Sequence, residues 1–365
     1  MIEILGKELS LRKLLYIITC SLFFIPLLVS SSFAEAPSIE EKLDAAFHDG
    51  ELSGLHSVLV IHKGEILAER YYPGADQRWG DPLGAVNHNA SQLHDLRSVS
   101  KSVTSLLYGI ALAEGLVPEL DQIVVEQFPE YEDLAADPAR RKILIKDVLS
   151  MQMGTDWNES LPYTDPRNSE IAMEKSSDRY RYVLDRAILS EPGQKWVYNG
   201  GATAIIARLI EKGAGKPIDV YAREKLFTPL GIGDFEWVSG RDGVPSAASG
   251  LRLNNHDLAK LGLLIVDKGV WQGHQIIPVS WLERSFKPEA FTSVGLRYGL
   301  FWWLAPNGSP PYWAAGFGNG GQRLLIDEAN QLVMVIFAGN YNQPNAWQLP
   351  VKVITKFVLP VVLAK

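Results

Sequence analysis

Residues 94–105 read HDLRSVSKSVTS, and they combine the start of a helix with two reactive side chains. Apolar residues recur at helical spacing from Val99 to Ile110 until Gly115 ends the pattern, which predicts a largely buried helix. Ser98 and Lys101 lie three residues apart, so their hydroxyl and amine are expected on one face of this helix. Taken alone, the S-x-x-K spacing also fits an N-cap serine followed by a solvated lysine.

The chemical interpretation of this pair starts from the weakness of a lone serine hydroxyl as a nucleophile. A neighbouring amine can accept its proton if the amine is neutral, and burial is expected to lower the pKa of Lys101 in that direction. The N–H groups at the start of the helix would add a partial positive charge beside the reacting atoms. The pair therefore predicts an activated serine at position 98.

Outward from this helix, the pattern predicts strands at both ends of the chain and helices between them. β-rich runs at 57–61 and 65–72 predict a hairpin around Lys63-Gly64. Further strands are expected at 300–304, 322–326 and 332–338, and helices at 145–153, 180–189, 202–212, 218–227 and 351–359. These elements predict a discontinuous α/β region, residues 35–115 and 241–365, with an inserted helical region, residues 116–240, and the active site between the two regions.

Several motifs follow the S-x-x-K segment in a fixed order. They are IKDVLSMQMG at 145–154, EPGQKWVYNGG at 191–201, GLRL at 250–253 with DLAKLG at 257–262, and GFGNGGQ at 316–322. Together they resemble the β-lactamase-related serine hydrolases, the superfamily of class C β-lactamases, DD-peptidases, family VIII esterases and 6-aminohexanoate-dimer hydrolases. The resemblance covers nearly all of residues 50–345 and implies a β-lactamase/transpeptidase-like α/β fold, an antiparallel sheet flanked by helices with an inserted, mostly helical region.

The resemblance also implies roles for individual residues. Ser98 would be the nucleophile, Lys101 its partner, and Tyr198 the second catalytic element, whose hydroxyl ionises more easily beside an ammonium and can relay a proton. The backbone N–H groups of Ser98 and Gln322 would form the oxyanion hole.

Two segments depart from the family pattern. Many relatives read Tyr-Ser-Asn where this chain has Tyr198, Asn199 and Gly200, so Asn199 is carried as a candidate substrate contact in place of the missing asparagine. Relatives place Lys-Thr-Gly or His-x-Gly on a strand lining the pocket, where this chain has Asn319, Gly320 and Gly321 as candidate substrate-binding residues. A neutral Asn319 weakens the case for penicillins, and the segment alone reads as a glycine-rich turn.

Composition and charge narrow the function classes. The chain has 365 residues, 47% hydrophobic residues and a formal net charge of −7, which is typical of a globular protein. It has no concentrated basic block, so nucleic-acid binding is not expected. The seven histidines include no close pair at metal-ligand spacing, and neither a metal nor another cofactor is predicted.

The N-terminus has the layout of a secretory signal. Lys7, Arg12 and Lys13 precede an apolar stretch at 14–29 and small residues up to Ala34. Residues 1–34 are therefore predicted to be a signal peptide cleaved after Ala34, and the mature protein is expected in the periplasm or outside the cell. An uncleaved anchor is the alternative, and it would be the only contact with a membrane.

These observations predict a serine hydrolase that acts through an acyl-enzyme on an ester or amide of a small molecule or short peptide. One alternative keeps the fold but has the penicillin-recognising chemistry of a DD-peptidase or β-lactamase. The other is a catalytically silent cell-wall binding module, against which the joint presence of Ser98, Lys101 and Tyr198 counts. The sequence leaves the substrate and the oligomeric state open.

Overall fold

An antiparallel sheet of eight strands joins the two ends of the described chain. Its order is β10-β11-β12-β13-β14-β15-β1-β2. The strands are β1 (Leu55–His62), β2 (Glu65–Tyr71), β10 (Ala290–Phe291), β11 (Arg297–Tyr298), β12 (Trp303–Leu304), β13 (Ala314–Gly318), β14 (Gln322–Asp327) and β15 (Leu332–Ala338). The strand β1 pairs with β15, with Leu59 opposite Val335, so the N-terminal hairpin and the C-terminal hairpin form one sheet as the sequence predicted.

This computed structural model describes residues 37–306 and 312–364. The predicted signal peptide, residues 1–34, lies outside the described residues. Within those ranges, no helix combines the length and apolar character that crossing a membrane requires.

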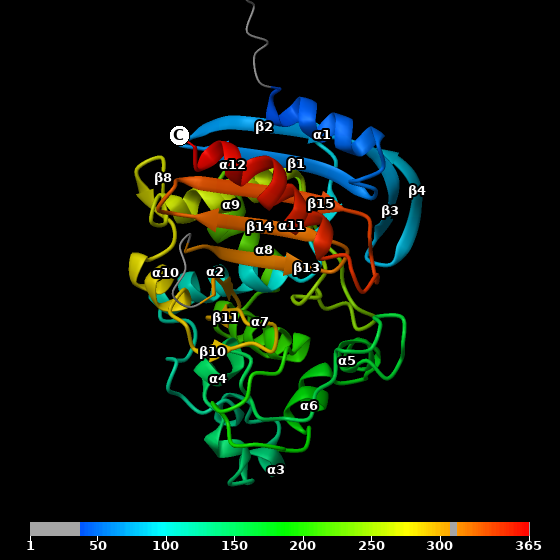
Figure 1. Cartoon of the computed structure of the whole chain (residues 1–365). Helices are drawn as coiled ribbons and strands as arrows, with labels where there is room; N and C mark the ends of the chain where they lie inside the picture. Colours follow the sequence, from blue (N-terminus) through cyan, green and yellow to red (C-terminus); the bar gives the residue numbers. More distant parts are fainter. Residues whose placement is uncertain (1–36, 307–311, 365) are drawn as a thin grey trace, which may run out of the picture. The chain divides into compact units, whose positions relative to one another are not determined.

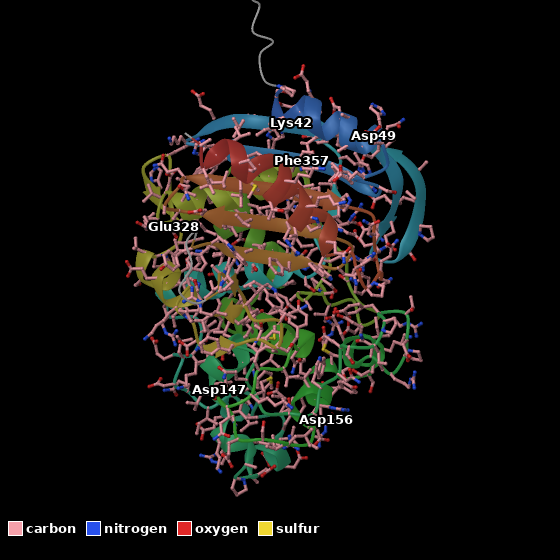
Figure 2. All side chains as sticks on the ribbon, in the orientation of Figure 1. Lys42, Asp49, Asp147, Asp156, Glu328 and Phe357 are labelled. Carbon is pink, nitrogen blue, oxygen red and sulfur yellow. The ribbon has the colours of Figure 1, made fainter. Side chains whose placement is uncertain are left out.

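The two faces of the sheet carry separate apolar clusters, because successive strand residues point to opposite sides. On β1, Val58 and Val60 belong to one cluster and Leu59 and Ile61 to the other. The first face is covered by α1 (Ile39–His48) and by the C-terminal helices α11 (Gln348–Lys352), η4 (Val353–Val358) and α12 (Leu359–Val362) (Figure 1). The buried Phe357 of η4, labelled in Figure 2, belongs to the cluster on this face.

The second face is covered by α9 (Asn255–Val266) and by α2 (Val99–Ala113), which lies between the sheet and the helical region (Figure 1). Thirteen consecutive residues of α2, from Val99 to Ala111, are buried. A helix buried all round must be surrounded by other elements, and this burial explains why the predicted apolar pattern is continuous and not restricted to one stripe.

The region between β5 (His94–Asp95) and β7 (Leu251–Leu253) is mainly helical. Its helices are η1 (Val125–Gln127), α3 (Glu132–Ala135), η2 (Arg140–Lys142), α4 (Ile145–Leu149), α5 (Ser169–Lys175), α6 (Arg179–Leu184), α7 (Gly200–Ala214), α8 (Ile218–Ala222) and the π-helical turn η3 (Arg223–Phe227), and α10 (Val279–Ser285) follows later. The helices predicted at 202–212 and 218–227 are present, whereas the one predicted at 180–189 ends at Leu184.

Smaller sheets complete the fold. They are β3 (Pro73–Arg78) with β4 (Asp81–Asn87), β5 (His94–Asp95) with β7 (Leu251–Leu253) and β6 (Glu236–Trp237), and β8 (Val270–Trp271) with β9 (His274–Gln275). The hairpin β3–β4 was not predicted, because its exposed residues lack an apolar alternation.

The strand predicted at 300–304 is wrong for its first three residues. Only Trp303 and Leu304 form strand β12. The preceding Phe301 has a φ of +62° and its N–H donates to the carbonyl of Leu149, so the backbone turns away from the sheet. Two hydroxyls of α2 stabilise this turn: Ser102 donates to the carbonyl of Phe301 at 2.8 Å, and Ser105 donates to the carbonyl of Leu300 at 2.7 Å.

Candidate active site

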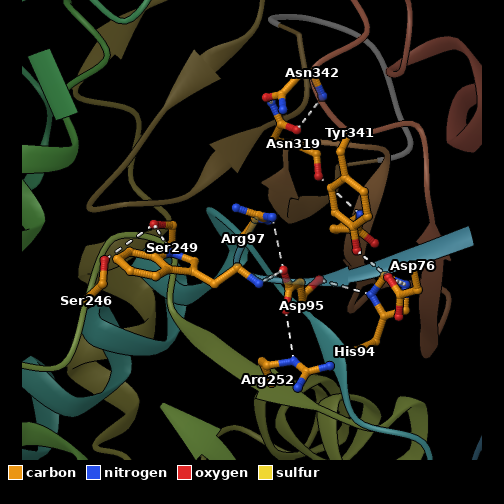
Figure 3. A network of polar contacts seen from close by, with 12 residues as sticks. Asp76, His94, Asp95, Arg97, Ser246, Ser249, Arg252, Asn319, Tyr341 and Asn342 are labelled. Carbon is orange, nitrogen blue, oxygen red and sulfur yellow. Dashed lines mark hydrogen bonds and ion pairs between the residues drawn. The ribbon is translucent and has the colours of Figure 1, made fainter. Parts of the chain in front are cut away.

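Ser98 lies at the turn where β5 leads into α2. It is the N-cap residue of α2 and is 9% exposed. The residue before it, Arg97, has a φ of +49°, a conformation that non-glycine residues seldom adopt and that is often found at functional sites. The buried carboxylate of Asp95 pairs with Arg97 at 3.1 Å and with Arg252 at 2.8 Å (Figure 3), and these pairs brace the turn.

Lys101 lies one turn along α2, with its amine directed at Ser98 as the spacing predicted. The distance from Nζ to Ser98 Oγ is 3.1 Å. Nζ also donates to the carbonyl of Ala248 at 3.0 Å and lies 3.5 Å from Oε2 of Glu170. The side chain is 1% exposed, so these contacts replace water entirely.

The charge state expected for Lys101 is wrong. Burial does act to lower its pKa, but the carboxylate of Glu170, with contributions from Tyr198 and Glu159, outweighs burial and raises the pKa above the ordinary value. Lys101 is therefore held as an ammonium at neutral pH. The sequence could not indicate this result, because both carboxylates come from a loop and a short helix more than 50 residues away.

Tyr198 is the third member of this group. Its ring lies 5.0 Å from the Lys101 ammonium, and its hydroxyl shares a hydrogen bond with the side chain of Ser98. Burial raises the pKa of Tyr198, whereas the Lys101 ammonium and the hydrogen bond from Ser98 act to lower it. The structure thus brings the three residues predicted as catalytic into one contact group.

Two glutamates, which the sequence did not single out, complete the surroundings of this group: Glu170 is buried and Glu159 is partly buried. Glu170 follows the helix cap of α5, where the side chain of Asn168 accepts from its N–H at 3.0 Å. Glu159 accepts from Trp157 Nε1 at 2.6 Å and from the hydroxyl of Tyr163 at 2.9 Å. Burial, reinforced by the nearby Glu170, raises the pKa of Glu159 to about 7.

Glu170 also explains the glycine that replaces the usual asparagine at position 200. A Cβ at Gly200 would lie 2.1 Å from Oε2 of Glu170, so the carboxylate occupies the space that a side chain at 200 would need. The N–H of Gly200 donates to Glu159. The departure from the family pattern at 200 is therefore paired with a carboxylate supplied from α5.

The structure does not place Asn199 where substrate contact would require it. Its side chain is 3% exposed and accepts from the N–H of Ala202 at 3.0 Å, which caps helix α7. Its amide nitrogen faces the sulfur of Met153 at 3.8 Å. Asparagine is a favoured N-cap residue, and the expected substrate contact is replaced by this structural role.

Asn319, Gly320 and Gly321 form the turn between β13 and β14, as the glycine-rich segment taken alone indicates, and not the strand on which relatives carry the motif. Both glycines have positive φ, +91° and +104°, which the tight turn requires. Asn319 faces the pocket, and its carbonyl group on the side chain accepts from the N–H of Asn342 at 2.8 Å. The side chain of Gln322 is buried against Ala338, donating to its carbonyl at 2.6 Å and accepting from its N–H at 3.1 Å, which fixes the backbone at the start of β14.

A pocket of about 300 Å³ opens at Ser98, and Asn319 also lines it. Cations and anions both face it: the cationic lining residues are Arg97, Lys175 and Arg241, and the anionic ones are Glu170 and Glu174. Its volume lies at the lower end of the range for small-molecule sites. The pocket therefore contains positive charge even though position 319 is an asparagine and not a lysine.

Three of the histidines gather in space, although the sequence shows no close pair at metal-ligand spacing. His56, His88 and His94 converge with Asp76, and each offers a ligand atom within 4.8 Å of the others. Sequence spacing missed this group because its members come from three separate segments, which only the packing of β1, the β3–β4 hairpin and β5 brings together.

The comparisons with known proteins agree with the fold. The Beta-lactamase family model matches residues 40–346. A 6-aminohexanoate-dimer hydrolase from Paenarthrobacter ureafaciens is 25% identical over 326 residues, which cover 82% of this chain and 74% of that protein.

Solved structures share the fold at lower identity. A family VIII carboxylesterase has a TM-score of 0.64 at 18% identity, with 86% of this chain and 95% of that chain covered. A penicillin-binding protein homologue from Pyrococcus abyssi has a TM-score of 0.66 at 16% identity, with 89% and 77% covered. With its antiparallel sheet, its serine at the start of α2 and its match over most of its length, the chain belongs to the β-lactamase family of serine hydrolases.

Proposed function

We propose that the protein hydrolyses an ester or amide of a small molecule or short peptide through an acyl-enzyme formed on Ser98. The observation that carries this proposal is the contact group of Ser98, Lys101 and Tyr198 beside a pocket that Ser98 lines, with 3.1 Å between the Ser98 hydroxyl and the Lys101 amine. A nucleophile hydrogen-bonded to its proton acceptor, here the hydroxyl of Tyr198, meets the geometric requirement for covalent catalysis.

The proton route follows from the charge on Lys101. Because the carboxylates keep Lys101 protonated, the base is the phenolate form of Tyr198, which the Lys101 ammonium stabilises; it accepts the proton of Ser98 and becomes a neutral phenol. Ser98 Oγ bonds to the carbonyl carbon, and the bond to the leaving group breaks as Tyr198 returns the proton to that group. Water then attacks the acyl-enzyme by the same route in reverse and releases the acid.

The N–H groups of Ser98 and Gln322 are proposed to stabilise the oxyanion during both steps. Support comes from the position of the β13–β14 turn next to the nucleophile turn: a Cβ at Gly318 would lie 2.4 Å from the carbonyl oxygen of Leu96. The buried side chain of Gln322 holds the start of β14 in place. Preorganised donors of this kind are worth about 10²–10³ in kcat.

Substitution of the nucleophile tests the proposal. Ser98→Ala should abolish labelling by a fluorophosphonate and reduce turnover of p-nitrophenyl butyrate by several orders of magnitude, because the members of such a group act as a unit. The matched control is Ser102→Ala, which removes a hydroxyl of the same helix that donates to a backbone carbonyl at 2.8 Å. Peptide mass mapping identifies the labelled residue, and a label retained on another serine in Ser98→Ala would overturn the assignment.

A penicillin-recognising activity is the second candidate, and one observation favours it. Arg97 and Arg241 line the pocket, and a guanidinium can pair with a substrate carboxylate. Against it, Arg97 is already paired with Asp95 at 3.1 Å, and Glu170 and Glu174 face the same space. We therefore rank neutral esters and amides above penicillins, and we expect the protein to act on its substrate in the periplasm or outside the cell.

A further inference from the structure

We propose that His56, His88, His94 and Asp76 form a binding site for a divalent transition metal of the zinc type, separate from the hydrolase chemistry. The four side chains come from β1, from the β3–β4 hairpin and the residue that follows it, and from β5. Their ligand atoms all lie within 4.8 Å of one another.

The distances fit one small metal ion. His56 Nδ1 lies 2.9 Å from His94 Nε2, and His94 Nε2 lies 3.6 Å from Asp76 Oδ1 (Figure 3 shows His94 and Asp76). Zinc binds histidine nitrogen and carboxylate oxygen at about 2.0–2.2 Å, so neighbouring ligand atoms of a tetrahedral site are separated by roughly 3.4 Å. The two measured separations fall on either side of that value.

The hydrogen bonds around the rings direct lone pairs toward a common point. His94 Nδ1 lies 3.1 Å from the carbonyl oxygen of Asp95, which can only accept, so His94 carries its proton on Nδ1 and a lone pair on Nε2. His56 makes a backbone hydrogen bond with Ala75, and its Nε2 is the edge that packs against Gly74 and Gly339. If His56 carries its proton on Nε2, it has a lone pair on Nδ1, which faces the lone pair on Nε2 of His94. A cation bound between the two nitrogens would coordinate both lone pairs.

Two buried polar atoms of the group have no hydrogen-bond partner in the described part of the chain. They are Nε2 of His88 and Oδ2 of Asp76. Asp76 is 5% exposed, and its other oxygen accepts from the hydroxyl of Tyr341 at 3.0 Å. Buried polar atoms without partners are costly, and a metal ion would give the His88 nitrogen the partner it lacks.

The donor set selects the class of metal. Three imidazoles and one carboxylate match tetrahedral zinc, whereas calcium and magnesium prefer sites made wholly of oxygen. The histidines also have hydrogen-bonding partners behind them, such as the Asp95 carbonyl behind His94, as metal-binding histidines usually do. With one carboxylate and three neutral rings, a bound divalent ion would leave a net charge of +1.

The place of the group in the fold suggests a structural role. His94 is next to Asp95, whose carboxylate braces Arg97 and the nucleophile turn, and Tyr341 stacks near both His94 and Arg97. A bound ion would tie the β3–β4 hairpin, which packs little apolar surface, to β1 and β5. Metal binding would therefore stabilise the fold on the side of the hairpin without entering the reaction.

Metal titration of the purified chain, with any affinity tag removed and after treatment with a chelator, tests this proposal. We expect one Co²⁺ per chain with the visible absorption of tetrahedral cobalt, displacement of that Co²⁺ by Zn²⁺, and a rise in Tm with Zn²⁺. His88→Ala should weaken Zn²⁺ binding by at least about 100-fold, because it removes a metal ligand. Removing a residue that only hydrogen-bonds to a ligand usually weakens metal binding by roughly 10–100-fold. His274→Ala, a substitution of an exposed histidine on β9, should bind as the unmodified chain does.

The isosteric Asp76→Asn keeps the test decisive if His88→Ala does not fold, as judged by circular dichroism, because it removes the anionic ligand without removing volume. It should weaken binding and abolish the Tm shift. The proposal is wrong if the unmodified chain binds no stoichiometric Co²⁺ or Zn²⁺ at micromolar concentration. Equal binding by the unmodified chain and by a folded His88→Ala or Asp76→Asn variant would also overturn it.

Discussion

Replacing Glu170 by glutamine should make the catalytic base of this enzyme easier to deprotonate. The carboxylate of Glu170 is the principal group that raises the pKa of Lys101, and it also acts to raise the pKa of Tyr198. Glu170→Gln removes this charge from both residues and keeps an oxygen that can accept from Ser249, which now donates at 2.9 Å. The direction of the effect is the same whichever of the two residues accepts the proton of Ser98.

The separation of the charges sets the size of the effect. Glu170 Oε2 lies 3.5 Å from Lys101 Nζ, and both side chains are at most 4% exposed. At an effective dielectric constant of about 20, two unit charges at this distance attract one another by about 5 kcal/mol, equivalent to roughly 3 pKa units. Since the surroundings relax when a charge is removed, we expect the acidic limb of the pH profile to move down by about one to three units.

The pH dependence of kcat/KM on p-nitrophenyl butyrate measures this shift, because its limbs report the pKa values of the free enzyme. Glu174→Gln is the matched control: Glu174 lies one turn further along α5 and lines the same pocket, but it pairs with Arg179 at 3.0 Å. An acidic limb that stays in place in Glu170→Gln, or that moves equally in both variants, would show that Glu170 does not set the charge state of this group.

Three further predictions concern the same site. Lys101→Ala and Tyr198→Phe should each lower the acylation rate, measured by single-turnover kinetics, by at least about 10²-fold. The double variant should lose less than the two single losses multiplied together, and a loss equal to that product would mean that the two residues act in separate steps. Burial gives Glu159 a pKa of about 7 in the folded protein, so between about pH 4.5 and 7 the folded state holds a proton that the unfolded state has released. Thermal unfolding measured from about pH 4.5 to 7 should therefore show a loss of stability as the pH rises, and this loss should be smaller in Glu159→Gln. An identical pH dependence in the two proteins would contradict the prediction. Asn319→Lys should increase kcat/KM on nitrocefin by roughly 10- to 150-fold, the value of one charge-assisted hydrogen bond of about 1.5 to 3 kcal/mol, while the unmodified enzyme should prefer p-nitrophenyl butyrate; the opposite preference would favour the penicillin-recognising alternative.

Local patterns in the sequence determined the elements that depend on neighbouring residues. The hairpins β1–β2 and β14–β15 follow from β-rich runs on either side of short turns, and the helix α2 follows from continuous helical spacing between Val99 and Gly115. The same spacing placed Lys101 beside Ser98, because residues three apart on a helix share a face. The ordered motifs added the family and, with it, the position of Tyr198.

Only the tertiary structure decided the electrostatics of the site. The charge on Lys101 depends on Glu159 and Glu170, which reach it from other elements, and the glycine at 200 makes room for one of those carboxylates. Coulombic and desolvation effects depend on distances and burial in space, and neither can be obtained from spacing along the chain.

The same reason applies to the side chains whose roles changed. Asn199 caps α7 because the chain enters that helix with extended backbone, φ −146° and ψ 104°, which directs the side chain to the free N–H groups of the first turn. His56 and His94 are 38 residues apart in the sequence but 2.9 Å apart in space. Their contact exists because β1 and β5 pack together around the β3–β4 hairpin, an arrangement set by the burial of the whole sheet and not by any local pattern.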